Sequence, residues 1–306
     1  MNNNIKYLIT LAGPTAVGKT MLSINLAQHF NTVIVNADSR QVYREMKIGT
    51  ARPDDKEITM APHYFFGTHS IEDYLSAGIF SEQVNKLFED LFRTYDLIIF
   101  TGGSGLYIKG AIEGFDEIPE VESTIRERLN SRYAEEGLER LVQELKVLDP
   151  EYYAQVDKNN PQRVIRALEV CLGTGKKYSG YRKSVKREKP YTNIKIALER
   201  DRTELFDRIN RRVDEMMSSG LLEEVKTIFN LRHLPALQTV GYQELFDFLE
   251  GNCSLENAVE MIKQNTRKFA KRQMTWFKKD KEFTWFHPNQ TNEIIEFIET
   301  ETRKTT

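Results

Sequence analysis

The sequence predicts an α/β fold: a parallel sheet flanked by helices, with a small all-helical insertion and a helical C-terminal part. Three observations predict it. Short apolar runs alternate with helix-periodic segments over the first hundred residues. A glycine-rich loop at residues 13–20 joins the first apolar run to the first helix. Residues 119–158 contain helical patterns and no strand-like run, which predicts an insertion there and a core built from residues 1–118 and 159–306.

The first hundred residues predict three strands separated by helices. An apolar run at 7–12 comes first, and an apolar-periodic helix follows the glycine-rich loop. A β-branched run at 32–35 predicts the second strand, and apolar residues at helical spacing between 80 and 92 predict the next helix. The run at 97–100, closed by glycines, predicts the third strand. Strands connected through helices in this way form a parallel sheet.

The order of elements then changes. Charged amphipathic segments at 125–145 predict one or two helices with no strand between them. Asn160 and Pro161 are a capping residue and a first-turn residue, so a helix begins there, and it is expected to stop at Gly173. The stretch 174–189, rich in Lys, Gly, Ser and Tyr, predicts a basic loop. The chain then returns to a strand, a mainly helical region and a short aromatic strand, at residues 194–198, 203–279 and 283–286.

The composition is that of an ordinary globular protein. The 306 residues are 40% hydrophobic and 29% charged with a net charge of −2, which excludes a uniformly basic nucleic-acid coat and an acidic disordered chain. Cys171 and Cys253 are too few for a disulfide framework or a zinc site, so a reducing compartment is expected. The N-terminus has no basic segment before its short apolar run, so we expect no signal peptide, no membrane partner and a cytoplasmic location.

The neutral total conceals two basic segments. Residues 263–281 contain eight basic residues and one acid, and residues 176–189 contain seven and one. Because these segments together carry +13, the rest of the chain carries −15. Basic segments on an otherwise acidic chain indicate local contacts with a polyanion.

The C-terminal basic segment has a helical pattern. Lys263, Arg267, Lys271 and Lys278 lie within about 80° of one another, beside a stripe of apolar and aromatic residues. This arrangement is typical of contact with a nucleic-acid backbone and its bases. The alternative is a solvated face balanced by acids elsewhere, and the scarcity of acids in this helix argues against it.

The strongest chemical signal is the loop at 13–20, which fits G-x-x-x-x-G-K-[ST] between a strand and a helix. Its glycines allow successive backbone N–H groups to point at one phosphate, and the helix N-terminus adds to the attraction. We expect the ammonium of Lys19 to bind the phosphate and the hydroxyl of Thr20 to bind Mg²⁺. The loop alone does not choose between a nucleotide and a diphosphate. The predicted binding residues are Gly13, Pro14, Thr15, Ala16, Val17, Gly18, Lys19 and Thr20.

Two further polar residues follow predicted strands. Ligands of open parallel sheets bind beyond the carboxyl ends of the strands, which is where Asp38 and Ser104 lie. Asp38 is a general base, a metal-site carboxylate or a capping residue. Ser104 lies in a glycine turn that either approaches a ligand or only reverses the chain. The five histidines show no metal-ligand spacing, and the aromatic run at 62–66 is expected to pack.

Arg212 lies inside the apolar stripe of its predicted helix. A cation on an inward face requires a partner, which is either an anionic ligand or an internal salt bridge. Arg208 is expected to flank the stripe, and Arg211 is expected to face solvent.

Together these motifs resemble those of the bacterial tRNA dimethylallyltransferases, the IPP transferase family. The resemblance runs in order from about residue 7 to residue 286, and its specificity comes from the whole series. The motifs are GPTAVGKT at 13–20, NADS at 36–39, QVY at 41–43, GTARP at 49–53, GGSGLY at 102–107, NPQR at 160–163, RALE at 166–169, VGY at 240–242 and KRQMTW at 271–276.

The resemblance implies a P-loop NTPase/kinase-like core that performs no phosphoryl transfer. It implies transfer of a dimethylallyl group from dimethylallyl diphosphate to the N6 amine of the adenosine on the 3′ side of the tRNA anticodon, with release of diphosphate. Asp38 matches the family's base, and Ser104 and Arg126 match two positions that stabilise the transition state. Ser104 replaces the more usual threonine and keeps the hydroxyl. Arg212 would be a second cation on the diphosphate, with Mg²⁺ as the cofactor.

The resemblance also implies the partner and its contacts. We expect a monomer that binds the anticodon stem-loop of tRNA. The segments that match the family's RNA-contacting positions are Asp38, Ser39, Arg40 and Gln41; Gln162, Arg163, Val164, Ile165 and Arg166; Gln238, Thr239, Val240, Gly241, Tyr242 and Gln243; and Lys271, Arg272, Gln273, Met274, Thr275, Trp276, Phe277 and Lys278.

Three other functions share some of these features. A nucleoside or nucleotide kinase has the same loop but does not need the basic C-terminal helix. A shorter relative that prenylates free adenine nucleotides lacks a comparable basic tail. A non-enzymatic RNA-binding ATPase would not need Asp38 as a base, so a substitution of Asp38 distinguishes it from the transferase.

Overall fold

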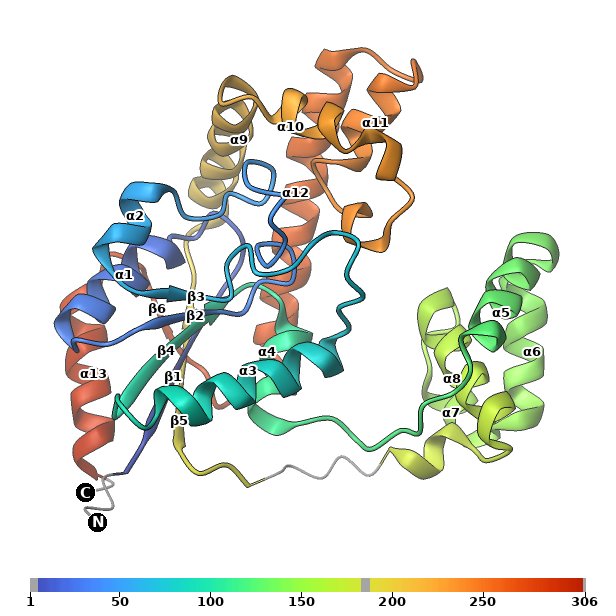
Figure 1. The fold of residues 1–306 in the computed structure, drawn as a ribbon, viewed down its shortest axis with the longest axis horizontal. Coiled ribbons are helices and arrows are strands. Elements are labelled where there is room, and N and C mark those ends of the chain that lie inside the picture. The colour runs from blue at the N-terminus through green and yellow to red at the C-terminus, as the bar shows by residue number, and fades with distance from the viewer. Residues whose placement is uncertain (1–4, 183–187, 305–306) are drawn as a thin grey trace. The chain divides into compact units, whose positions relative to one another are not determined.

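A computed structural model describes residues 5–182 and 188–304 (Figure 1). The chain divides into two compact units, which we call the α/β unit (Met1–Ile112 and Glu188–Thr306) and the helical unit (Glu113–Arg187). The helical unit extends beyond the predicted insertion at 119–158 because the helix that follows the insertion packs on its helices. Within the described residues, no helix has the length and apolarity that a membrane span requires.

The α/β unit contains a six-stranded parallel sheet with the strand order β3-β2-β4-β1-β5-β6, which confirms the predicted fold class. The first strand lies in the middle of the sheet, where β4 and β5 pair with it on either side. The strands are β1 (Tyr7–Ala12), β2 (Ile34–Asn36), β3 (His63–Tyr64), β4 (Leu97–Gly102), β5 (Thr192–Leu198) and β6 (Thr284–Phe286).

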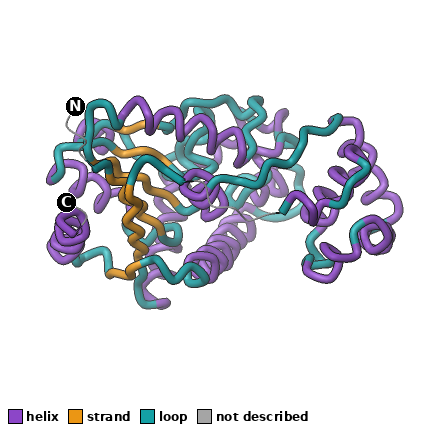
Figure 2. Tube along the Cα trace, turned by 90° about the horizontal axis from the view of Figure 1, so that it is seen from below, coloured by secondary structure: helices purple, strands orange, loops and turns teal. Residues whose placement is uncertain are grey.

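Helices cover both faces of this sheet (Figure 2). Successive side chains of a strand point to opposite faces, so Leu8 joins one core and Ile9 the other. The first core lies mainly under α3, α4 and α12, and the second under α1, α9 and α13. The helices are α1 (Lys19–His29), α2 (Asp55–Met60), α3 (Ala77–Leu91), α4 (Gly105–Glu113), α9 (Arg202–Ser218), α10 (Leu221–Thr227), α11 (Gln243–Leu249), α12 (Leu255–Phe277) and α13 (Thr291–Lys304), with the short 3₁₀ turns η2 (Phe229–Leu231) and η3 (Pro235–Leu237).

The helical unit has its own core, in which Leu129, Leu141, Leu145 and Leu168 are fully buried. Such a core explains why these residues form a separate compact unit. Its elements are α5 (Ser123–Glu136), α6 (Leu138–Leu148), α7 (Pro150–Gln155), α8 (Pro161–Thr174) and the 3₁₀ turn η1 (Tyr178–Tyr181).

Two predictions for the end of α8 were wrong. The helix passes through Gly173 and ends before Gly175, whose φ of 68° favours glycine. Gly173 instead allows close packing, because a Cβ there would lie 2.4 Å from the side chain of Val121. The predicted basic loop contains η1, and the ring of Tyr178 packs on that of Tyr152 at 4.8 Å. The rest of that predicted loop, residues 183–187, lies outside the described residues.

Candidate functional site

A cavity of about 380 Å³ lies at the carboxyl ends of β1, β2 and β4. It brings together Lys19, Thr20, Asp38 and Arg212, which were predicted from widely separated motifs to meet at one ligand. Parallel strands end at the same edge of the sheet, so the segments that follow them converge there. Ser104 is not part of the lining.

The phosphate loop links β1 to α1. Gly18, with a φ of 116°, precedes the first helical residue, Lys19. The ammonium of Lys19 donates to the carbonyl oxygens of Gly13 at 2.9 Å and Pro14 at 2.8 Å. Burial lowers the pKa of Lys19 to about 8, although the Asp38 carboxylate opposes this shift. A desolvated cation of this kind is stabilised when a bound phosphate takes the place of the lost water.

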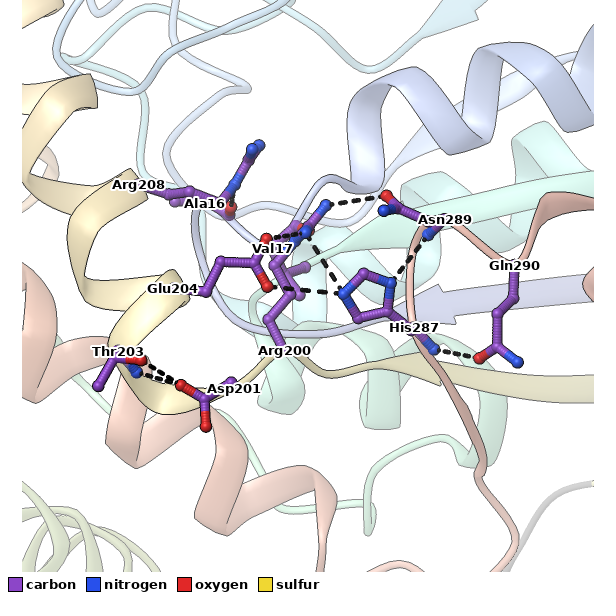
Figure 3. A network of polar contacts seen from close by, with 10 residues as sticks. All are labelled: Ala16, Val17, Arg200, Asp201, Thr203, Glu204, Arg208, His287, Asn289 and Gln290. Carbon is purple, nitrogen blue, oxygen red and sulfur yellow. Dashed lines mark hydrogen bonds and ion pairs between the residues drawn. The ribbon is translucent and has the colours of Figure 1, made fainter.

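Two arginines hold the outer side of this loop (Figure 3). The Nε–H of Arg200 donates to the carbonyl of Val17 at 2.8 Å, and Arg208 donates to that of Ala16 at 2.8 Å. Arg200 also pairs with Glu204, and its side chain is only 7% exposed. These bonds fix the positions of two backbone carbonyl groups of the loop.

Arg208, Arg211, Arg212 and Glu215 of α9 all line the cavity. Their spacing of i, i+3, i+4 and i+7 is that of one helical face. Arg211 is exposed to solvent, as expected, and it also lines the cavity. The cavity therefore carries four cations, these arginines and Lys19.

Arg212 forms no ion pair among the described residues. Its guanidinium donates to the carbonyl of Ala51 at 3.3 Å. Burial lowers the pKa of Arg212, and the nearby Asp38 carboxylate acts in the opposite direction. Of the two alternatives for Arg212, the geometry favours an anionic ligand over an internal salt bridge.

Asp38 is held in a tight turn after β2. Its backbone N–H donates to the side-chain oxygen of Asn36 at 2.8 Å, and the Asn36 amide donates to the Asp38 carbonyl at 3.1 Å. One carboxylate oxygen of Asp38 accepts from the N–H groups of Arg40 at 2.9 Å and Gln41 at 3.4 Å. Asn36 is buried, so it fixes the position of the Asp38 backbone.

Ser104 lies at the start of α4 and connects to the same turn. Its hydroxyl accepts from the N–H of Ser39 at 2.9 Å and donates to the Ser39 hydroxyl at 3.1 Å. The glycine turn before it permits close approach, because a Cβ on Gly102 would lie 2.3 Å from the backbone carbon of Ala37. Ser104 thus joins the two segments that follow β2 and β4, and its predicted role in the transition state stays a prediction.

A carboxylate on α10 organises the loop before α2. Glu224 accepts from the backbone N–H groups of Lys47 at 2.9 Å, Ile48 at 2.7 Å and Gly49 at 2.9 Å. It also accepts from the hydroxyl of the fully buried Tyr242 at 2.7 Å. We call these contacts the Glu224 clamp. No motif or local pattern distinguishes Glu224 from the other acidic residues of the sequence.

Several members of the predicted RNA-contacting segments have buried side chains. The side chains of Tyr242, Gln273 and Phe277 are buried in the α/β unit, and those of Val164 and Ile165 in the helical unit. Their neighbours Arg163, Gln243, Lys271 and Lys278 are exposed, and for those residues RNA contact stays a prediction.

The basic stripe of α12 is partly used inside the protein. Lys263 pairs with Asp214 at 2.8 Å, and Arg267 donates to Asn210 at 2.5 Å, both on α9. Lys278 pairs with Glu199 at 3.2 Å but keeps 58% of its side chain exposed. The expectation that the whole stripe faces RNA was therefore wrong for Lys263, whose partner lies on a different helix.

Arg126 belongs to the helical unit, where it forms a cluster with residues of α8. Its guanidinium pairs with Glu169 at 2.9 Å and donates to Gln162 at 3.1 Å. The other oxygen of Glu169 pairs with Arg166 at 3.1 Å. The cluster holds two partly exposed guanidinium groups side by side on one buried carboxylate, an arrangement suited to phosphate.

Part of the aromatic run at 62–66 also reaches the cavity. His63 and Phe66 line it, which the sequence did not predict. The His63 ring packs edge-on against Phe66 at 5.3 Å, and burial lowers the pKa of His63. These rings and Met21 give an otherwise charged cavity an apolar wall.

Known proteins resemble this chain over most of its length. A family model described as IPP transferase matches residues 41–280. A tRNA dimethylallyltransferase 1 of Bacteroides thetaiotaomicron is 50% identical over 291 residues, which cover 95% of this chain and 94% of that protein. A tRNA dimethylallyltransferase 1 of Phocaeicola vulgatus is 51% identical over 291 residues, with 95% and 97% covered.

Solved structures have the same fold. The tRNA isopentenylpyrophosphate transferase of Bacillus halodurans has a TM-score of 0.73 at 34% identity, covering 98% of this chain and 97% of its own. A eukaryotic dimethylallyltransferase described as acting on tRNA has a TM-score of 0.71 at 27% identity, covering 89% and 69%. The family model, the relatives and the P-loop-like α/β fold all lead to one conclusion: this chain belongs to the IPP transferase family.

Proposed function

We propose that this protein transfers a dimethylallyl group from dimethylallyl diphosphate to the N6 amine of the adenosine on the 3′ side of the tRNA anticodon, with release of diphosphate. One observation carries the proposal: a phosphate loop, three arginines and Asp38 line a single cavity. Relatives that are half identical to the chain bear the name tRNA dimethylallyltransferase, which supports the same reaction.

The charges of the cavity suit a diphosphate leaving group. Lys19 and three arginines of α9 face three carboxylates of Asp38, Glu57 and Glu215, so the lining is positive overall. Negative charge on the diphosphate grows as its bond to the allylic carbon breaks. Fixed cations in a desolvated site lower the energy of that charge, and desolvation lowers the pKa of both Lys19 and Arg212.

Asp38 would take the proton from the acceptor. The N6 lone pair attacks the allylic carbon, an N–C bond forms, and the C–O electron pair leaves with the diphosphate. One oxygen of Asp38 is occupied by backbone N–H groups, whereas the other accepts no hydrogen bond among the described residues. That oxygen is available to remove the proton. An adenine that is stacked inside the anticodon loop of the tRNA must be flipped out of the stack to reach such a cavity.

Mg²⁺ is the metal that we propose for this reaction. The described residues contain no cluster of three or more His, Cys, Asp or Glu side chains, which argues against a fully protein-ligated metal. Mg²⁺ binds through few protein oxygens and keeps waters and substrate phosphates, so a sparse set of oxygen donors fits it. The Thr20 hydroxyl on the cavity wall would hold it, and the bound ion would neutralise charge on the diphosphate.

The exposed basic residues of α12, with Trp276 at 38% exposure, provide a surface for the RNA backbone and a base. We also propose that the protein acts as a monomer. We expect the reaction in the cytoplasm, where its tRNA substrate is found.

The test is incubation of the protein with labelled dimethylallyl diphosphate, Mg²⁺ and unmodified tRNA, with and without ATP. Label in tRNA that does not depend on ATP is the expected result. Asp38→Asn, which keeps the shape of the side chain, should abolish label transfer and leave the tRNA Kd within about threefold. Label that appears only with a small-molecule acceptor, or a phosphorylated product from ATP, would refute the proposal.

A further inference from the structure

Gln273 lies on α12 among residues predicted to contact RNA, but its side chain is only 5% exposed. Both ends of its amide are used inside the protein. The oxygen accepts from the backbone N–H of Thr15 at 2.9 Å, and the nitrogen donates to the carbonyl of Gly103 at 2.8 Å. One side chain therefore joins two segments that are far apart in the sequence.

One of these segments lies at the proposed site of the donor, and the other lies near the proposed site of the acceptor. Thr15 lies in the phosphate loop, where the donor binds. Gly103 precedes Ser104, whose hydroxyl holds the N–H of Ser39 beside the proposed base Asp38. The amide of Gln273 is thus a direct side-chain link between the donor loop and the turn that supports the acceptor side, in addition to the pairing of Ala12 with Gly102 in the sheet.

Close packing around α12 makes this link rigid. A Cβ on Gly103 would lie 2.4 Å from the amide nitrogen of Gln273, so only glycine permits the contact. Two residues further, a Cβ on Gly105 would lie 2.2 Å from the indole ring of Trp276. The buried face of α12 therefore rests directly on the backbone of the glycine turn over residues 103–105.

We propose that Gln273 is a positioning residue that sets the distance between the phosphate loop and the Gly103 turn, and that it does not contact RNA. This inference rests on the proposed function. An RNA contact would require Gln273 to leave both partners, and the Thr15 N–H and the Gly103 carbonyl would then lose their hydrogen bonds. The exposed neighbours Lys271 and Lys278 can reach RNA without that loss.

The test measures kcat at saturating substrates and the tRNA Kd separately. Gln273→Met keeps the length of the side chain and removes both hydrogen bonds. We expect kcat to fall about 30-fold, which corresponds to about 2 kcal/mol of barrier, while the tRNA Kd stays within twofold. The matched control is Gln264→Met, the same change at an exposed position of the same helix, and it should leave both quantities unchanged.

A second variant probes the same link from the other side. Gly103→Ala should push the Gln273 amide away and reproduce the fall in kcat without a change in the tRNA Kd. Because both changes break one link, the double variant should be no slower than the slower single variant. If the two substitutions caused unrelated structural defects, their fold-reductions in kcat would instead multiply in the double variant. Thermal unfolding followed by tryptophan fluorescence establishes that each variant is folded.

Each outcome decides between the alternatives. A tenfold rise in the tRNA Kd of Gln273→Met would show an RNA contact and overturn the inference, whatever happens to kcat. A kcat equal to that of Gln264→Met, or a multiplicative double variant, would overturn it as well. The proposed function fails separately, if the unaltered protein transfers no dimethylallyl group to tRNA.

Discussion

The Glu224 clamp gives a prediction whose size follows from the structure. Glu224→Gln keeps the shape of the side chain but replaces one acceptor oxygen by a donor. If the new NH₂ group faces Tyr242, the tyrosine hydroxyl can rotate and accept, but the N–H of Gly49 is left facing a donor. A hydrogen bond to a charged group is worth about 1.5–3 kcal/mol. If the NH₂ group faces the other way, the N–H groups of Lys47 and Ile48 are both left facing a donor. With one or two such bonds lost, we expect the free energy of unfolding to fall by about 3 kcal/mol.

The assay is urea unfolding followed by tryptophan fluorescence. Trp276 and Trp285, the two tryptophans of the chain, both lie in the α/β unit, so the signal reports on the unit that contains the clamp. The matched control is Glu223→Gln, because the neighbouring Glu223 side chain is 72% exposed and pairs with Lys226 on the same helix. That exposed pair should contribute at most about 0.5 kcal/mol. If Glu224→Gln loses no more than Glu223→Gln, the reasoning is refuted.

Three further predictions concern the cavity and the RNA surface. The Lys19 ammonium is lost as the pH rises through its pKa of about 8, so kcat/KM for dimethylallyl diphosphate should fall above that pH in a one-proton step; in Lys19→Arg any residual activity should lack the step. Gly102→Ala places a Cβ 2.3 Å from the backbone of Ala37, and it should lower Tm by several degrees, whereas an unchanged Tm would contradict the packing. Lys271→Ala should reduce the salt dependence of tRNA binding by about one unit of slope. Lys263→Ala should not, since Lys263 is paired within the protein, and equal slopes for the two variants would count against this assignment.

Local signals were sufficient for the core elements of the fold. The run at 7–12, the glycine loop and the following helix are contiguous in sequence, so periodicity and turn chemistry identify them together. The strand β3 has only two residues, which is too short for any periodicity to appear. The order of the strands depends on tertiary packing. Nothing within Tyr7–Ala12 indicates that its neighbours are Leu97–Gly102 and Thr192–Leu198.

The difference between local sequence signals and long-range packing also explains which site residues were predicted and which were missed. Asp38 could be predicted because the carboxyl end of a strand has a known relation to ligands. Arg211 could have been found from its spacing to Arg208 and Arg212. Gln273 and Glu224 act through backbone groups 258 and about 175 residues away in sequence, and no local pattern encodes such partners.

The central position of β1 has a consequence for how the protein is made. β1 is synthesised before the other five strands of the sheet, but its partner β5 lies beyond the helical unit and is synthesised nearly two hundred residues later. Until then one edge of the apolar strand β1 has no partner strand, and the phosphate loop that follows β1 is not held in place by the complete sheet. Pairing across such sequence separation is slow. A nascent chain that stops before Thr192 therefore carries an exposed sheet edge that favours aggregation, and nucleotide- or diphosphate-binding capacity is acquired late in synthesis.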